Sequence, residues 1–347
     1  MKFLIAALLA IFAYGLNADI DPDSHGPVGV MGDHYHKAGE IMLSYRFMLM
    51  SMRDNLNGKK IISPETIVTS IPNTFSSLPM MPAKLRVTPT KMNMQMHMLG
   101  MMYAPNDRVT VMGMVNQITN KMSHITFAGP AGATMLGNFE TKTSGFGDIN
   151  LSGLFKIHET AQSRWHINAG LSIPTGSIDK KGSILTPMNT RPLVRLPYPM
   201  QLGSGTFDLI MGLTNARKWE TWGWGSQWMS VMRLNKNTED YSLGNQHKFN
   251  TWLSYQLSDR LSASTRVELI HQSDIKGRDR MIIAPVQTAD PDRQGGQRLN
   301  IAVGLNAVLP DKRLRMAIEI LAPSFQKLNG PQLSTDWSIT LGTQFIP

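Results

Sequence analysis

Methionine and histidine are the residue types in this sequence that could do chemistry. The chain contains 25 methionines, and most of them lie between Met31 and Met135. Thioethers coordinate Cu(I), and neutral imidazole is a common metal ligand. Methionine also fills irregular apolar space without any metal. The sequence therefore leaves two interpretations open, an apolar or amphipathic lining and a copper site. The candidate copper ligands are His34, His36, Met94, Met96, His97 and Met112.

The elements that must position these side chains are strands. Leu299, Ile301, Val303 and Leu305 alternate with small or polar residues. Similar alternating runs break at short turns that contain Asp107, Asp259 and Asp311. Asp and Asn close tight turns through their own backbone, and two alternating runs joined in this way form an antiparallel hairpin.

Recurring hairpins predict an all-β fold, a transmembrane antiparallel up-and-down β-barrel of about twelve strands. Short periplasmic turns would lie at one end and long extracellular loops at the other. The last strand ends on Phe345, an aromatic residue of the kind that the outer-membrane assembly machinery recognises. An interfacial aromatic girdle is expected from Trp219, Trp222, Trp224, Trp228, Trp252 and Tyr255.

The N-terminus predicts secretion. Lys2 precedes an apolar run that is too short to span a bilayer as a helix. We expect a signal peptide over residues 1–18, a periplasmic tail or partial plug over 19–38 and the barrel over 39–347. The predicted location is the outer membrane of a Gram-negative bacterium, with membrane lipid, lipopolysaccharide and a small-molecule solute as partners. Secretion argues against nucleic acid as the partner of the +9 formal charge.

Arg46 decides which face of the first strand looks inward, because an arginine facing lipid near mid-bilayer costs roughly 2–4 kcal/mol. Alternation carries that inward face across the neighbouring hairpins. Charged residues on later strands are expected to form ion pairs inside. The predicted lumen-lining residues are Met42, Arg46, Met48, Met50, Met52, Met94, Met96, Met98, Met112, Met114, Arg266, Glu268, Arg315 and Glu319.

Enzyme motifs are absent from the sequence. There is no cysteine, no Gly-x-Ser-x-Gly elbow and no His-Glu-x-x-His pair. A proposal of hydrolase activity would therefore be based on the fold alone, and we expect no enzymatic activity.

Three blocks of sequence resemble a group of bacterial outer-membrane proteins that are labelled as transporters. The blocks are residues 33–46, which begin with Asp-His-Tyr-His, residues 96–105 and residues 144–151. The chain is also similar to outer-membrane proteins of phenol-degradation operons. The resemblance implies a barrel with a transport role and provides no active site.

Three functions follow as hypotheses. The first is a channel for a small, hydrophobic or amphipathic solute through a Met-lined lumen. The second is a copper-binding or copper-handling barrel that uses Met and His. The third is a barrel that transports nothing and serves adhesion or structure.

Overall fold

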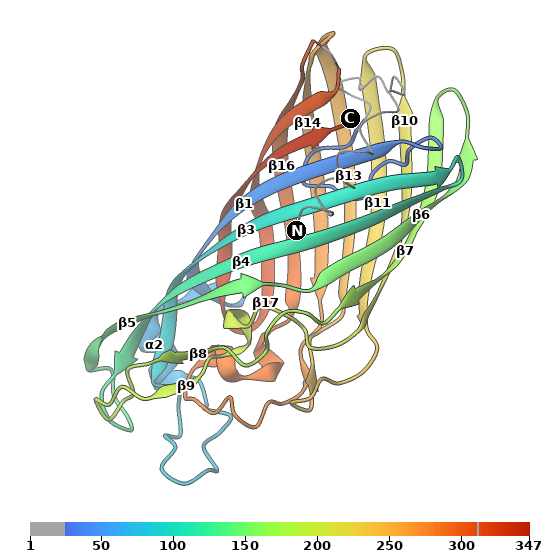
Figure 1. Cartoon of the computed structure of the whole chain (residues 1–347). Helices are drawn as coiled ribbons and strands as arrows, with labels where there is room; N and C mark the ends of the chain where they lie inside the picture. The colour runs from blue at the N-terminus through green and yellow to red at the C-terminus, as the bar shows by residue number, and fades with distance from the viewer. Residues whose placement is uncertain (1–24, 311) are drawn as a thin grey trace.

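A closed wall of antiparallel strands forms the body of the protein (Figure 1). The computed structural model describes residues 25–310 and 312–347. The expected signal peptide, the first part of the expected tail and Asp311 lie outside the described residues. Each neighbouring pair of strands in the wall is antiparallel, and pairing of β1 with β17 closes the ring. The wall strands are β1 (Ile41–Gly58), β3 (Val87–Asn106), β4 (Val109–Phe127), β6 (Ile149–Glu159), β7 (Ser163–Ile173), β10 (Asp208–Lys218), β11 (Trp222–Arg233), β13 (Gln246–Ser258), β14 (Leu261–Gln272), β16 (Gly296–Val308) and β17 (Leu314–Phe345).

The last element, β17, crosses the wall twice. Its first part pairs antiparallel with β16 up to Leu328, and its second part pairs antiparallel with β1 from Gln332 onward. Nine antiparallel steps separate β1 from β16, so these two strands run in opposite directions. One straight strand cannot be antiparallel to both, and β17 must therefore reverse near Gly330, which has a φ of +77°. The ring then has twelve crossings, in agreement with the expected number of about twelve.

Smaller elements extend or cover the end of the barrel opposite the C-terminus (Figure 1). The strand β2 (Lys60–Ile62) pairs with β1, and β5 (Met135–Phe146) pairs with β4. Two small ribbons are β8 (Lys181–Ser183) with β9 (Leu193–Arg195), and β12 (Tyr241–Ser242) with β15 (Lys276–Gly277). The short helices are α2 (Pro64–Ser70), η2 (Tyr198–Met200), η3 (Gln287–Ala289) and η4 (Pro291–Arg293). Among the described residues, no helix is both long and apolar enough to cross a membrane.

The strand β5 continues the line of β6 along β4, with a break at Gly147 and Asp148. Phe146 pairs with Gln117, and Asn150 pairs with Met114 on the same strand. The side chain of Asp148 accepts hydrogen bonds from the backbone of Gly176 at 2.9 Å and of Ser204 at 2.8 Å. The break thus anchors the long connection between β7 and β10 at the wall.

Side chains alternate between the two faces of the wall as the sequence predicts. Ile301, Val303 and Leu305 are 48%, 58% and 48% exposed, whereas Ala302 between them is buried. Trp252 departs from the expected aromatic girdle, because it is only 5% exposed. It lies one residue from the outward-facing Leu253, so alternation turns its indole to the inside.

The topology can be tested with single cysteines, because the chain has none of its own. In intact cells, Met188→Cys in a long loop should react with a membrane-impermeant maleimide, whereas Asp259→Cys in a short turn should not. Met188 is 70% exposed, so access to its side chain is not limited by burial. Lysed cells serve as the control and should label both variants. Labelling of Asp259→Cys from outside intact cells would show that the short turns face the outside, contrary to the predicted topology.

Candidate functional site

A large apolar cavity lies among the long loops. Its volume is ≈ 690 Å³, which is within the range that accommodates drug-sized ligands. Its walls come from the connection between β1 and β3, from β5, and from the connections that follow β7 and β14. The lining includes Met81, Val87, His124, Phe139, Ile184, Pro187, Val194, Leu196, Ile283 and Val286. Phe139 stacks on His124 with ring centroids 4.6 Å apart.

The inner wall of this cavity is continuous with methionines of the barrel. Leu196 lines the cavity and also packs in a cluster with Met92, Met122 and Met200. Ile184 lines the cavity and packs against the same cluster, as does Met52 from β1. Buried apolar side chains therefore connect the cavity lining with the strands at this point.

Methionines face one another across neighbouring strands. Met48 pairs with Met96 and Met50 with Met94 between β1 and β3. Met102 pairs with Met42 on one side and with Met112 on the other. Met98 pairs with Arg46, and Gly100, two residues further along β3, pairs with Met114. Met42, Met98, Met102 and Met114 are buried, and the intervening Leu99 and Met101 are exposed.

The candidate copper ligands lie in three separate places. His34 lines a small cavity together with Met42, Met102 and Met112. Met96 pairs with Ile118, six residues along β4 from Met112, which corresponds to roughly 20 Å. His97 alternates to the other face, where its Nδ1 lies 2.8 Å from the hydroxyl of the exposed Tyr45. His36 has its Nδ1 3.2 Å from Glu40.

The predicted charged residues of β14 and β17 fall into two groups. In the first, Arg266 contacts Glu268 at 2.9 Å and Glu319 at 3.1 Å, and Asn300 donates to Glu268 at 2.9 Å. In the second, Arg315 donates to Gln344, to Asn306 and to the carbonyl of Gly26. Arg315 and Glu319, which share a face of β17, therefore have different partners.

Residues 25–38, which we call the inner segment, cross the interior near the short turns. Side chains from several wall strands donate to its carbonyls. His166 and Asn168 of β7 and Gln227 of β11 converge on the carbonyl of Gly32, the first at 2.9 Å. Arg315 of β17 donates to Gly26 at 2.8 Å. Because these strands lie on different sides of the ring, the inner segment is enclosed by the wall.

Two glycines allow this close fit. A Cβ atom at Gly29 would collide with the Glu319 carboxylate and the Arg266 guanidinium. A Cβ atom at Gly342 of β17 would collide with Val28 of the inner segment. The inner segment thus rests directly on the ion pair between β14 and β17.

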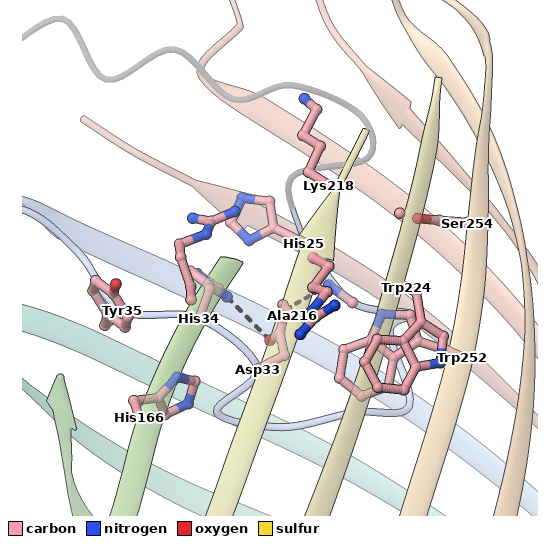
Figure 2. A pocket seen from close by; sticks show the side chains of 14 residues that line it. His25, Asp33, His34, Tyr35, His166, Ala216, Lys218, Trp224, Trp252 and Ser254 are labelled. Atoms are coloured by element: carbon pink, nitrogen blue, oxygen red, sulfur yellow. Dashed lines mark hydrogen bonds and ion pairs between the residues drawn. The ribbon is translucent and has the colours of Figure 1, made fainter. Parts of the chain in front are cut away.

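A small cavity beside the inner segment is lined by His25, Asp33, His34, Tyr35 and His166 (Figure 2). Burial lowers the pKa of His34 from 6.5 to about 4 and lowers the pKa of His25 well below 6.5. Both imidazoles are therefore neutral at neutral pH. Their lone pairs are available for hydrogen bonds or for a metal.

The sequence did not single out several residues of these sites. His166 and Gln227 meet the inner segment only because the barrel closes around it, and no spacing in the sequence relates them to it. Phe139 and Leu196 come from different connections that fold over the same end. The one sequence signal was the density of Pro and Gly in the long loops, which marks loops and not their contacts.

Comparison with known proteins gives a likeness of fold. No family model and no curated protein matches the chain. An outer-membrane channel from Pseudomonas putida F1 superimposes with a TM-score of 0.59 at 13% identity, over 92% of this chain and 99% of that one. A Pseudomonas aeruginosa FadL homologue gives 0.46 at 7% identity, over 94% and 98%. The P. putida toluene transporter TodX gives 0.41 at 8% identity, over 90% and 90%.

The likeness to the P. putida channel establishes the fold. The chain shares the β-barrel fold of that channel, and an identity this low carries no substrate or residue role from one protein to another. The two likenesses with TM-scores below 0.5 add nothing to this conclusion.

Replacement of Gly29 tests whether the inner segment is held in place by its close contact with Arg266 and Glu319. Gly29→Val should displace the segment from Arg266 and Glu319, because its side chain needs the space that their head groups occupy. We expect a higher ion conductance in planar bilayers than for the wild type. Gly113→Ala is the matched control in the wall, where a Cβ atom would meet only Leu151 at 3.4 Å. Equal conductance of Gly29→Val and the wild type would contradict the expectation.

Proposed function

We propose that this protein is an outer-membrane channel for the uptake of a small hydrophobic or amphipathic solute. The solute would enter the cavity among the loops, move along the methionine surface and leave towards the periplasm past the inner segment. The resemblance to outer-membrane transporters and the fold shared with the P. putida channel support this proposal.

The outer face of the wall supports a location in the membrane. Large apolar side chains are exposed on every part of the ring, for example Leu99 at 63%, Phe155 at 43% and Val303 at 58%. A soluble monomer rarely exposes such a continuous apolar surface. Strands of 11 to 13 residues, such as β6 and β16, have the length that a tilted crossing of a bilayer requires.

The observation that carries the proposal is the shared role of Leu196 and Ile184. Both line the loop cavity and both pack on the methionine cluster of β1, β3 and β4. A hydrophobic solute in the cavity would contact these side chains, and it would reach the methionines behind them when the packed side chains move aside. Methionine suits such a surface, because its flexible thioether adapts to different ligand shapes.

The inner segment would act as a plug in this scheme. Its hydrogen bonds to side chains of the wall hold it in place, and a solute would have to pass beside it or move it. The expected tail or plug over residues 19–38 is part of this proposal.

The copper-handling barrel remains an alternative without a specific observation in its favour. Met94 and Met96 lie far from His34 and Met112 along the strands, as described above. The apolar cavity does not support the adhesive or structural barrel, because a barrel with a purely structural role does not require a cavity for a ligand. The link with phenol degradation rests on the sequence resemblance alone.

The cavity can be tested with a fluorescent hydrophobic probe such as N-phenyl-1-naphthylamine. Phe139→Ala and Ile283→Glu should each weaken probe binding to the purified protein by about tenfold, which corresponds to about 1.4 kcal/mol. The first removes a ring from the lining, and the second puts a charge at the mouth, where Ile283 is 44% exposed.

Leu193→Glu is the matched control, because Leu193 is exposed in the same loop region but does not line the cavity. Its affinity for the probe should equal that of the wild type. A shift in electrophoretic mobility on heating would verify that every variant is folded. If the lining variants bind the probe as well as Leu193→Glu does, the cavity is not the binding site.

Replacing the thioethers separates the solute channel from the copper barrel. The triple variant Met94→Leu, Met96→Leu and Met112→Leu keeps the volume and apolar character of the surface. We expect solute passage to persist in liposome uptake assays and copper-dependent growth to be unchanged. Loss of copper binding or of copper-dependent growth in this variant would favour the copper-handling barrel instead.

A further inference from the structure

Three side chains of the inner segment gather at one point. His25, Asp33 and His34 each offer one potential ligand atom, and these atoms all lie within 4.8 Å of one another. The rings of His25 and His34 meet edge to face, with centroids 3.9 Å apart (Figure 2). The backbone N–H of Gly26 donates to Oδ2 of Asp33 at 2.6 Å and so brings the two ends of the loop together.

Two imidazole nitrogens at this point lack hydrogen-bond partners. His25 is 8% exposed and His34 is 7% exposed. Nδ1 of His25 and Nε2 of His34 have no hydrogen bond within the described structure. Nδ1 of His34 lies 3.0 Å from Oδ1 of Asp33. Buried polar groups are normally paired, so this arrangement calls for a further partner.

The set of donors indicates the kind of partner. Two imidazoles and one carboxylate are typical ligands of Zn²⁺ and of similar divalent transition metals. Calcium would need more oxygen ligands than the single carboxylate provides. The positively charged side chains of Arg164, Arg217 and Lys218 also line the cavity. Their charge further disfavours a cation that is bound by electrostatic attraction alone and not by coordination to imidazole.

We propose that His25, Asp33 and His34 bind one divalent transition-metal ion of the zinc type. Ligand atoms around a tetrahedral Zn²⁺ lie roughly 3.4 Å apart, given bonds of about 2.0–2.1 Å, so small side-chain rotations complete the site. A fourth position can be taken by water in the adjoining cavity of ≈ 30 Å³. Another donor is Nε2 of His36, which has no hydrogen bond and whose ring lies 4.9 Å from that of His34.

The metal would link the two ends of the loop formed by residues 25–34. This loop is the part of the inner segment that Arg315, His166 and Gln227 hold against the wall. A bound ion would therefore fix the conformation in which the segment crosses the interior. The site is distinct from the pairs Met48–Met96 and Met50–Met94 of β1 and β3, and it does not depend on the solute that the barrel carries.

Zinc binding to the purified full-length protein tests the proposal. The protein is stripped with EDTA, exchanged into chelator-free buffer and titrated with Zn²⁺ alone by calorimetry, with metal analysis of the dialysed sample. We expect one ion per chain. His25→Gln, His34→Gln and Asp33→Asn should each weaken binding at least about tenfold. Co²⁺ in place of Zn²⁺ should give visible absorption bands that His34→Gln abolishes.

His271→Gln is the matched control, because His271 lies on the outer face with its ring 6.3 Å from that of His247. It should bind zinc as the wild type does. A heat-modifiability assay confirms that each barrel is folded. The proposal is overturned if the folded wild type binds no zinc at one equivalent. It is also overturned if binding survives in folded His25→Gln and His34→Gln or is lost in His271→Gln. If a variant does not fold, the wild-type stoichiometry and the remaining two variants decide.

Discussion

Pairing of β1 with the second part of β17 is the interaction on which the rest of this structure depends. A sheet that stays open leaves a row of unpaired backbone N–H and C=O groups at each edge, which water must solvate. Closure satisfies both edges and at the same time defines an inside and an outside. Every assignment of a side chain to the outer face or the interior follows from that ring.

The interior created by closure is partly polar, and the inner segment makes use of this. An irregular segment carries backbone carbonyls that cannot remain buried without donors. His166, Asn168, Gln227 and Arg315 supply these donors from separate strands. Gly29 then allows the backbone to approach the Arg266–Glu319 pair more closely than any other residue would permit. The segment and the wall are therefore complementary in polarity and in shape.

The methionine surface has a different character. It lies on the long strands β1, β3 and β4, which extend beyond the rest of the wall towards the loops (Figure 1). At that end it joins the cavity through Leu196. Thioether side chains are flexible, whereas the polar groups around the inner segment are fixed by hydrogen bonds. Beside the inner segment, Met42 and Met102 form a second apolar cluster with Leu154.

The sequence by itself determined the strands of the barrel wall and which side chains lie on each of its two faces. Period-two alternation is a local property of the chain, because successive side chains of a strand point to opposite faces. The faces of β16, the short turns at Asp107 and Asp259 and the common face of Met42, Met98 and Met102 could all be predicted from it. Composition and the N-terminal apolar run added the expected compartment.

Only the tertiary structure decided which distant residues meet. Trp252 was expected in a girdle and lies inside, because one residue of register separates the two faces. Arg315 holds Gly26 of the inner segment instead of Glu319 on its own strand, since a long side chain reaches whichever acceptor the closed ring brings near it. His25 joins Asp33 and His34 through a loop that has no periodic pattern, and the loop cavity assembles from several separate connections. Such contacts depend on closure of the whole ring, and no local pattern in the sequence encodes them.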